Sequence, residues 1–389
     1  MKHLVDDSYR LLAAQYIRKQ IRQLAGQIEG IRKAEDIEYV HRARVASRRL
    51  RAALGMFRDC FAAKRVKTWR KAVRQVTRDL GDARDKDVQI LFVRGVLDRL
   101  QDKAQLPGVL RLLVHLERQR DAIQPAVLKA LGRLQENRVL DKMLARTKQM
   151  SKGLEERGVT VVSEPVLSRG EQHILSRVDC LLALESSLAD SQDVGQHHAL
   201  RIAAKRLRYT VETCRPAYTG RIDQILAAIK QIQTLLGEIH DCDVWTVYLQ
   251  AYLEDQQKRV VRLYGQPGPL DRLRVGIDYV RQDRQTERGQ LFARLVSYWR
   301  ELTEQGFWNA LAEVVRQRPE LAGSTNPSTP EEDPADPAVG RDTPQPCGAT
   351  EDSNGKGRAE HLAAPAGQPG QTAQGTGRPQ EVGTREHGQ

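Results

Sequence analysis

Aromatic residues are scarce in this chain, since Phe, Trp and Tyr make up only 5% of its 389 residues. Proteins that stack exposed nucleic-acid bases depend on aromatic faces, so this shortage disfavours a base-stacking function. The chain also lacks any run of about 18 apolar residues, the length that a membrane-spanning helix needs. Its first ten residues, MKHLVDDSYR, lack the apolar core of a signal peptide. We therefore expect a cytoplasmic protein without a membrane partner.

Motifs for metal binding and catalysis are missing as well. The five cysteines are widely separated and include no CxxC pair, so they form neither a zinc-ligand pattern nor an obvious disulfide framework. No glycine-rich phosphate loop, GxSxG or HExxH motif occurs, and no nucleophile stands with a base and an orienting group. The sequence therefore predicts a protein that is not an enzyme and uses no metal or cofactor.

Charge, in contrast, is abundant and unbalanced. The 62 Lys and Arg residues exceed the 50 Asp and Glu residues, which gives a net charge of +12 and a pI near 9.6. A balance this basic indicates an anionic partner such as nucleic acid, polyphosphate or an acidic membrane surface.

Residues 322–389 differ in composition from the rest of the chain. They contain nine of the sixteen prolines and almost no large apolar residues, and their ten acidic residues outnumber five basic ones. Such a segment buries too little apolar surface to offset its chain entropy, so we predict a disordered tail. The preceding residues are correspondingly more basic than the chain as a whole.

The remaining sequence predicts an all-α fold of antiparallel helical bundles. Leu, Ala, Arg, Gln and Glu dominate, and apolar residues recur at spacings of three and four. The one β-branched run, VTVVSEP at 159–165, stands where a linker would fit.

Two sequence blocks recur in the same order. HRARVASRRLRA at 41–52 matches HALRIAAKRLRY at 198–209 at six of twelve positions, and LGDARDKDV at 80–88 matches LGEIHDCDV at 236–244. This repetition predicts two pseudo-symmetric bundles that arose by internal duplication, one over residues 1–160 and the other over residues 161–321.

The first repeated block predicts an amphipathic helix with a row of cations. At about 100° per residue, one stripe collects a histidine and several basic residues, while Ala46, Leu50, Ala53 and Phe57 face the opposite side. In the second copy Ala203, Leu207 and Cys214 repeat that apolar face. The two stripes are His41, Arg44, Arg48 and Arg51 in the first copy and His198, Arg201, Lys205 and Arg208 in the second, with Arg49 and Arg206 at their edges.

These stripes have a plain interpretation as solvated faces and a sharper one as a polyanion site. Like charges three and four residues apart destabilise a helix, which favours a ligand that neutralises them. A guanidinium group forms bidentate hydrogen bonds to phosphate oxygens, and the ammonium group of Lys adds a point charge. A neighbouring phosphate also favours the protonated form of histidine. The recurrence of the pattern favours the polyanion site.

The second repeated block contains two aspartate pairs, Asp85 with Asp87 and Asp241 with Asp243. We expect them to cap the start of a helix or to complement its dipole. Binding of Mg²⁺ and pairing with arginines of the stripes are the alternatives.

The blocks VHRARVASRRLRAALGMF and LRIAAKRLRYTVE, each followed by the pattern LG[DE]xxDxDV, resemble the CHAD family, the conserved histidine α-helical domain. This resemblance covers roughly residues 5–305 and implies two helical bundles around a central basic channel that binds inorganic polyphosphate. It implies that the ten stripe and edge residues line this channel, with association to polyphosphate granules as a further possibility. A sequence-nonspecific nucleic-acid-binding protein, a metal-dependent enzyme of phosphate metabolism and a helical scaffold whose tail recruits partners remain the alternatives.

Overall fold

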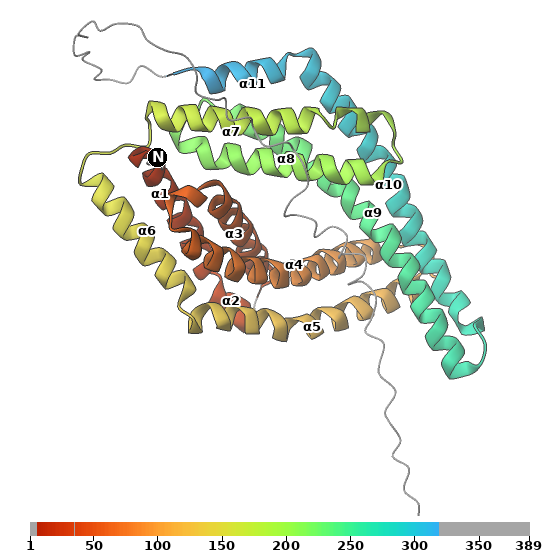
Figure 1. Cartoon of the computed structure of the whole chain (residues 1–389). Helices are drawn as coiled ribbons and strands as arrows, with labels where there is room; N and C mark the ends of the chain where they lie inside the picture. The colour runs from red at the N-terminus through yellow and green to blue at the C-terminus, as the bar shows by residue number, and fades with distance from the viewer. Residues whose placement is uncertain (1–5, 35, 319–389) are drawn as a thin grey trace, which may run out of the picture. The chain divides into compact units, whose positions relative to one another are not determined.

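The computed structural model describes residues 6–34 and 36–318, and all of their regular structure is helical. The predicted disordered tail at 322–389 lies outside these residues. The first half of the chain contains α1 (Asp7–Ala25), α2 (Ile28–Lys33), α3 (Ile37–Met56), η1 (Arg58–Cys60), α4 (Ala63–Arg99), α5 (Leu106–Glu136) and α6 (Val139–Glu155). The second half contains α7 (Glu164–Leu182), η2 (Glu185–Ala189), α8 (Val194–Cys214), η3 (Arg215–Ala217), α9 (Asp223–Tyr264), η4 (Gly268–Leu270), α10 (Asp271–Glu304) and α11 (Phe307–Arg316). The all-α prediction is confirmed (Figure 1).

Four of the described α-helices, α1, α3, α7 and α8, begin at a capping side chain. Asp6 accepts hydrogen bonds from the backbone N–H groups of Ser8 and Tyr9 at 2.9 and 3.1 Å, and Asp36 accepts one from Glu38 at 2.8 Å. These carboxylates satisfy N–H groups that have no partner within the first turn of a helix. Residues 156–163 connect α6 to α7 without forming a strand, so the VTVVSEP run forms the end of this connection and the first two residues of α7.

Both halves pack their helices in the same order. In the first half α6 contacts α1, α1 contacts α3, α3 contacts α4, and α4 contacts α5. In the second half α11 contacts α7, α7 contacts α8, α8 contacts α9, and α9 contacts α10. This shared order is what a duplication would produce, although the duplication itself stays a prediction from the sequence.

The halves meet through helices that occupy corresponding places. The contacts between them include α1 with α7, α3 with α8 and α5 with α10. Gly108 in α5 and Gly276 in α10 lie where these two helices cross, and a Cβ atom on either would overlap the backbone of the other helix. The two glycines therefore allow an unusually close approach of the halves.

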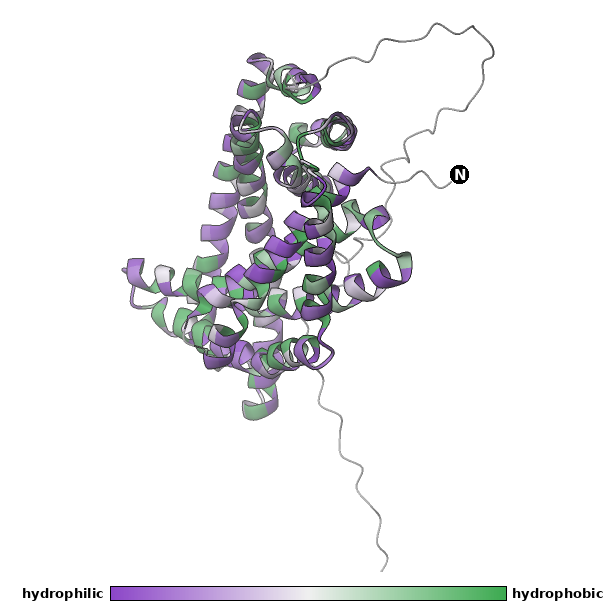
Figure 2. Ribbon diagram, turned by 90° about the vertical axis from the view of Figure 1, so that its left-hand side faces the viewer, coloured by the Kyte–Doolittle hydropathy of each residue, from purple (hydrophilic) through white to green (hydrophobic). Residues whose placement is uncertain are grey.

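The helices present their apolar faces inward (Figure 2). Ala46, Leu50, Ala53 and Phe57 are at most 2% exposed, as the helical stripe predicted. In the second copy Ala203, Leu207 and Cys214 are likewise buried. Burying these positions leaves the cationic stripes of α3 and α8 on the side away from the packed core.

Candidate functional site

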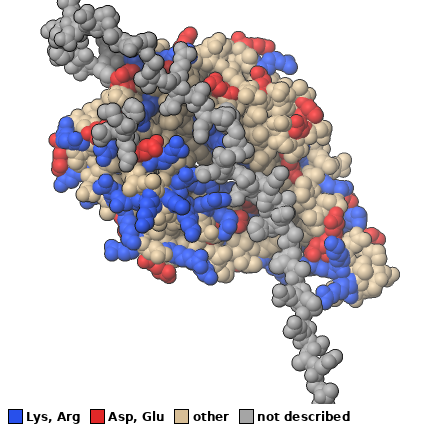
Figure 3. Space-filling model, in the orientation of Figure 1, with Lys and Arg blue, Asp and Glu red and all other residues tan. Residues whose placement is uncertain are grey.

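The ten candidate residues lie on α3 and α8, and each is partly buried. Only 14% of the Arg44 side chain, 25% of the Arg49 side chain and 20% of the Arg208 side chain is exposed. A fully solvated basic face would expose these long side chains more extensively. Figure 3 shows Lys and Arg gathered in a broad patch in the region of α3 and α4.

The two stripes come together where α3 and α8 touch. The guanidinium carbon of Arg48 lies 5.8 Å from the centre of the Tyr209 ring, and that of Arg208 lies 5.9 Å from the same centre. Cations at this distance are attracted by the negative face of an aromatic ring. Tyr209 thus brings one arginine from each copy of the motif to a common place.

Glu212 on α8 also joins the two copies. Its carboxylate accepts two hydrogen bonds from Arg49 at 3.0 Å each and two from Arg208 at 3.1 Å each. Burial alone would raise the pKa of Glu212, but the hydrogen bonds and charges of Arg49 and Arg208 hold it below its ordinary value. Glu212 is therefore ionised and offsets part of the charge that these arginines bring.

Arg44 is held by the second repeated block of its own half. Its Nη1 donates to Asp85 Oδ1 at 3.1 Å, and a Cβ atom at Gly81 would lie 2.8 Å from the same nitrogen. The glycine of the LGD sequence therefore gives the guanidinium room to lie across α4. The alternative in which an aspartate pairs with a stripe arginine is confirmed for Asp85.

The two motif histidines have different neighbours. Burial and then the charge of Arg84 lower the pKa of His41. Arg84 Nη1 is buried without a hydrogen-bond partner, at 3.7 Å from Glu38 Oε1. His198 instead lies against a second histidine, with its Nδ1 atom 3.4 Å from Nδ1 of His240. Arg84 and His240 hold the same place in the two LG blocks, so the first half has a fixed charge where the second has a group that titrates.

The expectation that the aspartate pairs cap helix starts is wrong. Both pairs lie inside long helices, α4 and α9, which continue on either side of them. Asp87 accepts a hydrogen bond from Arg120 of α5 at 2.7 Å, and Asp243 accepts one from Arg288 of α10. These two carboxylates fasten neighbouring helices together. No group of His, Cys, Asp and Glu suited to a metal ion occurs among the described residues.

Sequence reasoning missed several residues around the stripes. Glu212 stands four residues after Arg208, a spacing that signals an ion pair within a helix, but its bond to Arg49 depends on the packing of α3 against α8. Arg120 and Arg288 carry no local signal. Arg177 of α7 was missed too, and its pKa is lowered by burial and by the charge of Arg206. Arg51, Arg201, Lys205 and Arg206 are partly buried like the other candidates.

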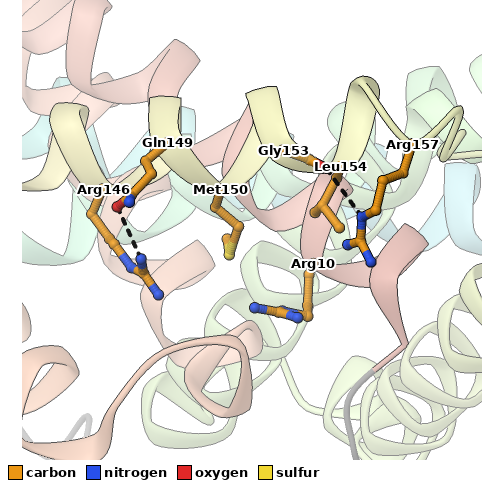
Figure 4. Close-up of a pocket in the computed structure, with 7 residues that line it drawn as sticks. All are labelled: Arg10, Arg146, Gln149, Met150, Gly153, Leu154 and Arg157. Carbon is orange, nitrogen blue, oxygen red and sulfur yellow. Dashed lines mark hydrogen bonds between the residues drawn. The ribbon is translucent and has the colours of Figure 1, made fainter.

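A pocket of about 300 Å³ lies elsewhere, between α1 and α6 (Figure 4). Arg10, Arg146 and Arg157 point into it around Met150. Two of these arginines are already paired, since Asp7 accepts from Arg10 at 3.0 Å and from Arg157 at 2.8 Å. The pocket contains none of the predicted stripe residues and does not extend the candidate site.

The fold and the site define an all-helical domain whose two halves each contribute a row of cations to a shared basic region. A sequence model of the CHAD domain matches residues 15–250, which is more than half of the chain, and the protein belongs to this family. No curated protein matches the chain. No described helix is long and apolar enough to cross a membrane.

Two solved structures are similar to this chain. The crystal structure of the CHAD domain from the plant Ricinus communis is 21% identical, with a TM-score of 0.50, and the match covers 81% of this chain and 95% of that one. PptA from Streptomyces chartreusis is 14% identical, with a TM-score of 0.45 over 74% of this chain and 98% of that one. The first similarity supports the CHAD fold.

Proposed function

We propose that this protein binds inorganic polyphosphate through the paired stripes of α3 and α8, without catalysing a reaction. The observation that supports this most strongly is the convergence of Arg48 and Arg208 on Tyr209, which brings cations from both motif copies to one place. A linear chain of phosphates can contact both rows at once. Membership of the CHAD family adds to this support.

Polyphosphate suits the site better than nucleic acid does. Sequence-specific recognition needs contacts to base edges, and single-strand binding relies on stacking platforms. Tyr209 already lies beneath two guanidinium groups and is only partly exposed. A dense row of guanidinium and ammonium groups can bind phosphate without reading a base.

Charge reversal tests the site directly. The variant Arg44→Glu, Arg48→Glu, Arg201→Glu should lose binding of long-chain polyphosphate, measured by titration at two salt concentrations. A matched control is Lys142→Glu, Lys148→Glu, Lys152→Glu, which makes the same change in net charge on exposed positions of α6. The control should retain most of the affinity. If the folded site variant bound as tightly as wild type, the proposal would be wrong.

Competition separates polyphosphate from nucleic acid. At equal phosphate concentration, polyphosphate should displace double- or single-stranded DNA from the protein, and the salt dependence should show release of counterions. Displacement of polyphosphate by DNA would favour the nucleic-acid alternative. Phosphate release from polyphosphate in the presence of Mg²⁺ would instead indicate an enzyme.

The same site would attach the protein to polyphosphate granules in the cytoplasm. Wild-type protein should sediment with isolated granules, and the triple site variant should stay in the supernatant while the α6 control sediments. Equal sedimentation of all three proteins would place the attachment elsewhere.

A further inference from the structure

The turn between α9 and α10 combines strongly exposed apolar side chains with an excess of positive charge. Figure 1 shows this end of the α9–α10 hairpin lying beyond the neighbouring helices. From residue 257 to residue 268 no described side chain is buried. Leu263 is 74% exposed and Tyr264 is 64% exposed, and Val261 is also exposed. At about 100° per residue these side chains leave the helix in different directions, and all three project into solvent.

Basic residues surround these apolar side chains. Residues 257–275, which we call the second tip, contain Lys258, Arg259, Arg262, Arg272 and Arg274, against Asp271 as the one acidic residue. All five basic residues are exposed. Arg259 pairs with Asp255, which lies one turn earlier on α9, at 2.8 Å.

The corresponding turn of the first half provides an internal comparison. Residues 92–110, the stretch of equal length around the turn between α4 and α5, contain three basic residues against two acidic ones. Leu106 and Leu110 are the large apolar side chains exposed there, at 39% and 43%. Moreover, α9 has 42 residues where α4 has 37, so the second hairpin has the longer arm. The second tip therefore carries a larger excess of positive charge and more exposed apolar side chains than its counterpart in the first half.

From this combination we infer that the second tip docks on an anionic membrane surface. Leu263 and Val261 can enter the boundary between headgroups and acyl chains, and an exposed Tyr is suited to the headgroup level. The surrounding Lys and Arg side chains would face anionic headgroups, each strengthening the attraction near the surface. The tip is convex, whereas a peptide partner would need a groove to receive its side chains. Docking of this kind needs no spanning helix, so it departs from the expectation of no membrane partner, which rested on the absence of long apolar runs and of a signal peptide.

Vesicle binding tests the inference on the full chain. Wild-type protein should sediment with vesicles of phosphatidylcholine and phosphatidylserine, and should bind vesicles of phosphatidylcholine alone far more weakly. The variant Leu263→Asp, Tyr264→Asp should lose at least tenfold in partition. The matched control Val88→Asp, Leu91→Asp places the same two charges at exposed apolar positions on α4 and should bind as wild type does.

The basic residues make a separate contribution. Arg262→Gln with Arg272→Gln should lower the partition roughly 25-fold at low salt, since each basic residue near an anionic surface contributes about fivefold. The stripes could also attract these vesicles, so every titration is repeated with polyphosphate in excess and with Arg44→Gln, Arg201→Gln. Both conditions should leave tip-dependent binding in place. If vesicle binding were lost under either condition while the tip variants bound vesicles as wild type does, the stripes would make the contact and the inference would be wrong.

Insertion has its own readout. Tryptophan introduced by Leu263→Trp should gain emission that brominated phosphatidylcholine quenches, beyond the signal from the native tryptophans. Absence of this quenching together with unchanged sedimentation of Leu263→Asp, Tyr264→Asp would exclude membrane docking and leave a protein partner as the occupant to seek.

Discussion

The two halves of this protein fold alike but hold their cations differently. In the first half Arg44 crosses Gly81 to reach Asp85, and Arg84 accompanies His41. In the second half His240 accompanies His198, a Cβ atom at Gly237 would meet no atom within 4 Å, and Glu212, the counterpart of Gly55, holds Arg208. What remains the same is the ion pair that ties each long helix to the next, Asp87 with Arg120 and Asp243 with Arg288. The comparison separates positions that maintain the fold from positions that adjust the charge of the site.

The matched ion pairs should give the largest effect. Arg120→Met leaves Asp87, which is 3% exposed, buried without its partner. Breaking such a pair destabilises a protein by about 3–5 kcal/mol. Arg288→Met should cost a similar amount, because Asp243 loses the same kind of partner. Urea unfolding of both variants measures this, and a small effect in only one half would show that the pairs are not equivalent.

Glu212 and Gly55 hold the same place in the two motif copies. Removing the carboxylate from one copy and adding one to the other therefore compares the two halves directly. Glu212→Gln removes the carboxylate that offsets Arg49 and Arg208, so polyphosphate should bind roughly five- to tenfold more tightly. Stability should fall by about 1–3 kcal/mol as hydrogen bonds to a buried charge are lost.

The reciprocal change, Gly55→Glu, should weaken polyphosphate binding, since a side chain at Gly55 meets no atom within 4 Å and can be accommodated. Isothermal titration at one salt concentration compares both variants with wild type. Tighter binding by Gly55→Glu, or weaker binding by Glu212→Gln, would contradict the assigned role of the carboxylate.

The glycines of the two LG sequences should respond differently to the same substitution. Gly81→Ala pushes against the Arg44 guanidinium and should weaken polyphosphate binding about threefold, within the range of one weakened charged hydrogen bond. Gly237→Ala meets no neighbouring atom and should leave binding unchanged. It should also stabilise α9 by roughly 0.5–1 kcal/mol, because alanine favours helix over glycine. Equal binding by the two variants would mean that Gly81 does not position Arg44.

Histidine protonation should give the smallest effect. The lowered pKa of His41 means that its imidazole is neutral near pH 7. Bound phosphate favours the charged form, so binding should take up a proton and strengthen as the pH falls from 7 towards 5.5. Folding has the opposite dependence, because a lowered histidine pKa stabilises the folded state above pH 6.5 and that contribution is lost on acidification.

Titrations at several pH values, with His41→Gln and His198→Gln, show how much of this dependence each half carries. An unchanged pH profile in both variants would exclude the histidines as its source.

Much of this arrangement could be predicted from the sequence, and the failures have specific causes. The helical period placed Leu50 and Leu207 in the core correctly, since burial depends on a pattern repeated along one helix. The prediction that the aspartate pairs cap helix starts was wrong, because α4 and α9 continue through the preceding glycines, Gly81 and Gly237. A glycine inside a long, well-packed helix costs only about 1 kcal/mol, and Gly81 serves a contact with another helix.

The sequence predicted which cations belong to the site, but it did not predict most of their hydrogen-bond partners. The identity of the stripes followed from the repeated motif, whereas the partners of Asp87, Asp243 and Arg49 lie on helices distant in sequence. Their pairing is set by how the bundles pack, and no local pattern encodes that. Hydrophobic periodicity could not reveal the second tip either, because the tip is distinguished by the exposure of its side chains, which depends on the packing of the other helices.

The stoichiometry of polyphosphate binding shows whether the stripes of α3 and α8 act as one site. Calorimetry with a short polyphosphate of defined length would compare wild type with Arg44→Gln, Arg48→Gln on α3 and Arg201→Gln, Lys205→Gln on α8. A shared site predicts one chain bound per protein and a marked loss of affinity in each double variant. Two independent sites would instead give two chains per wild-type protein, with each variant retaining one site of unchanged affinity.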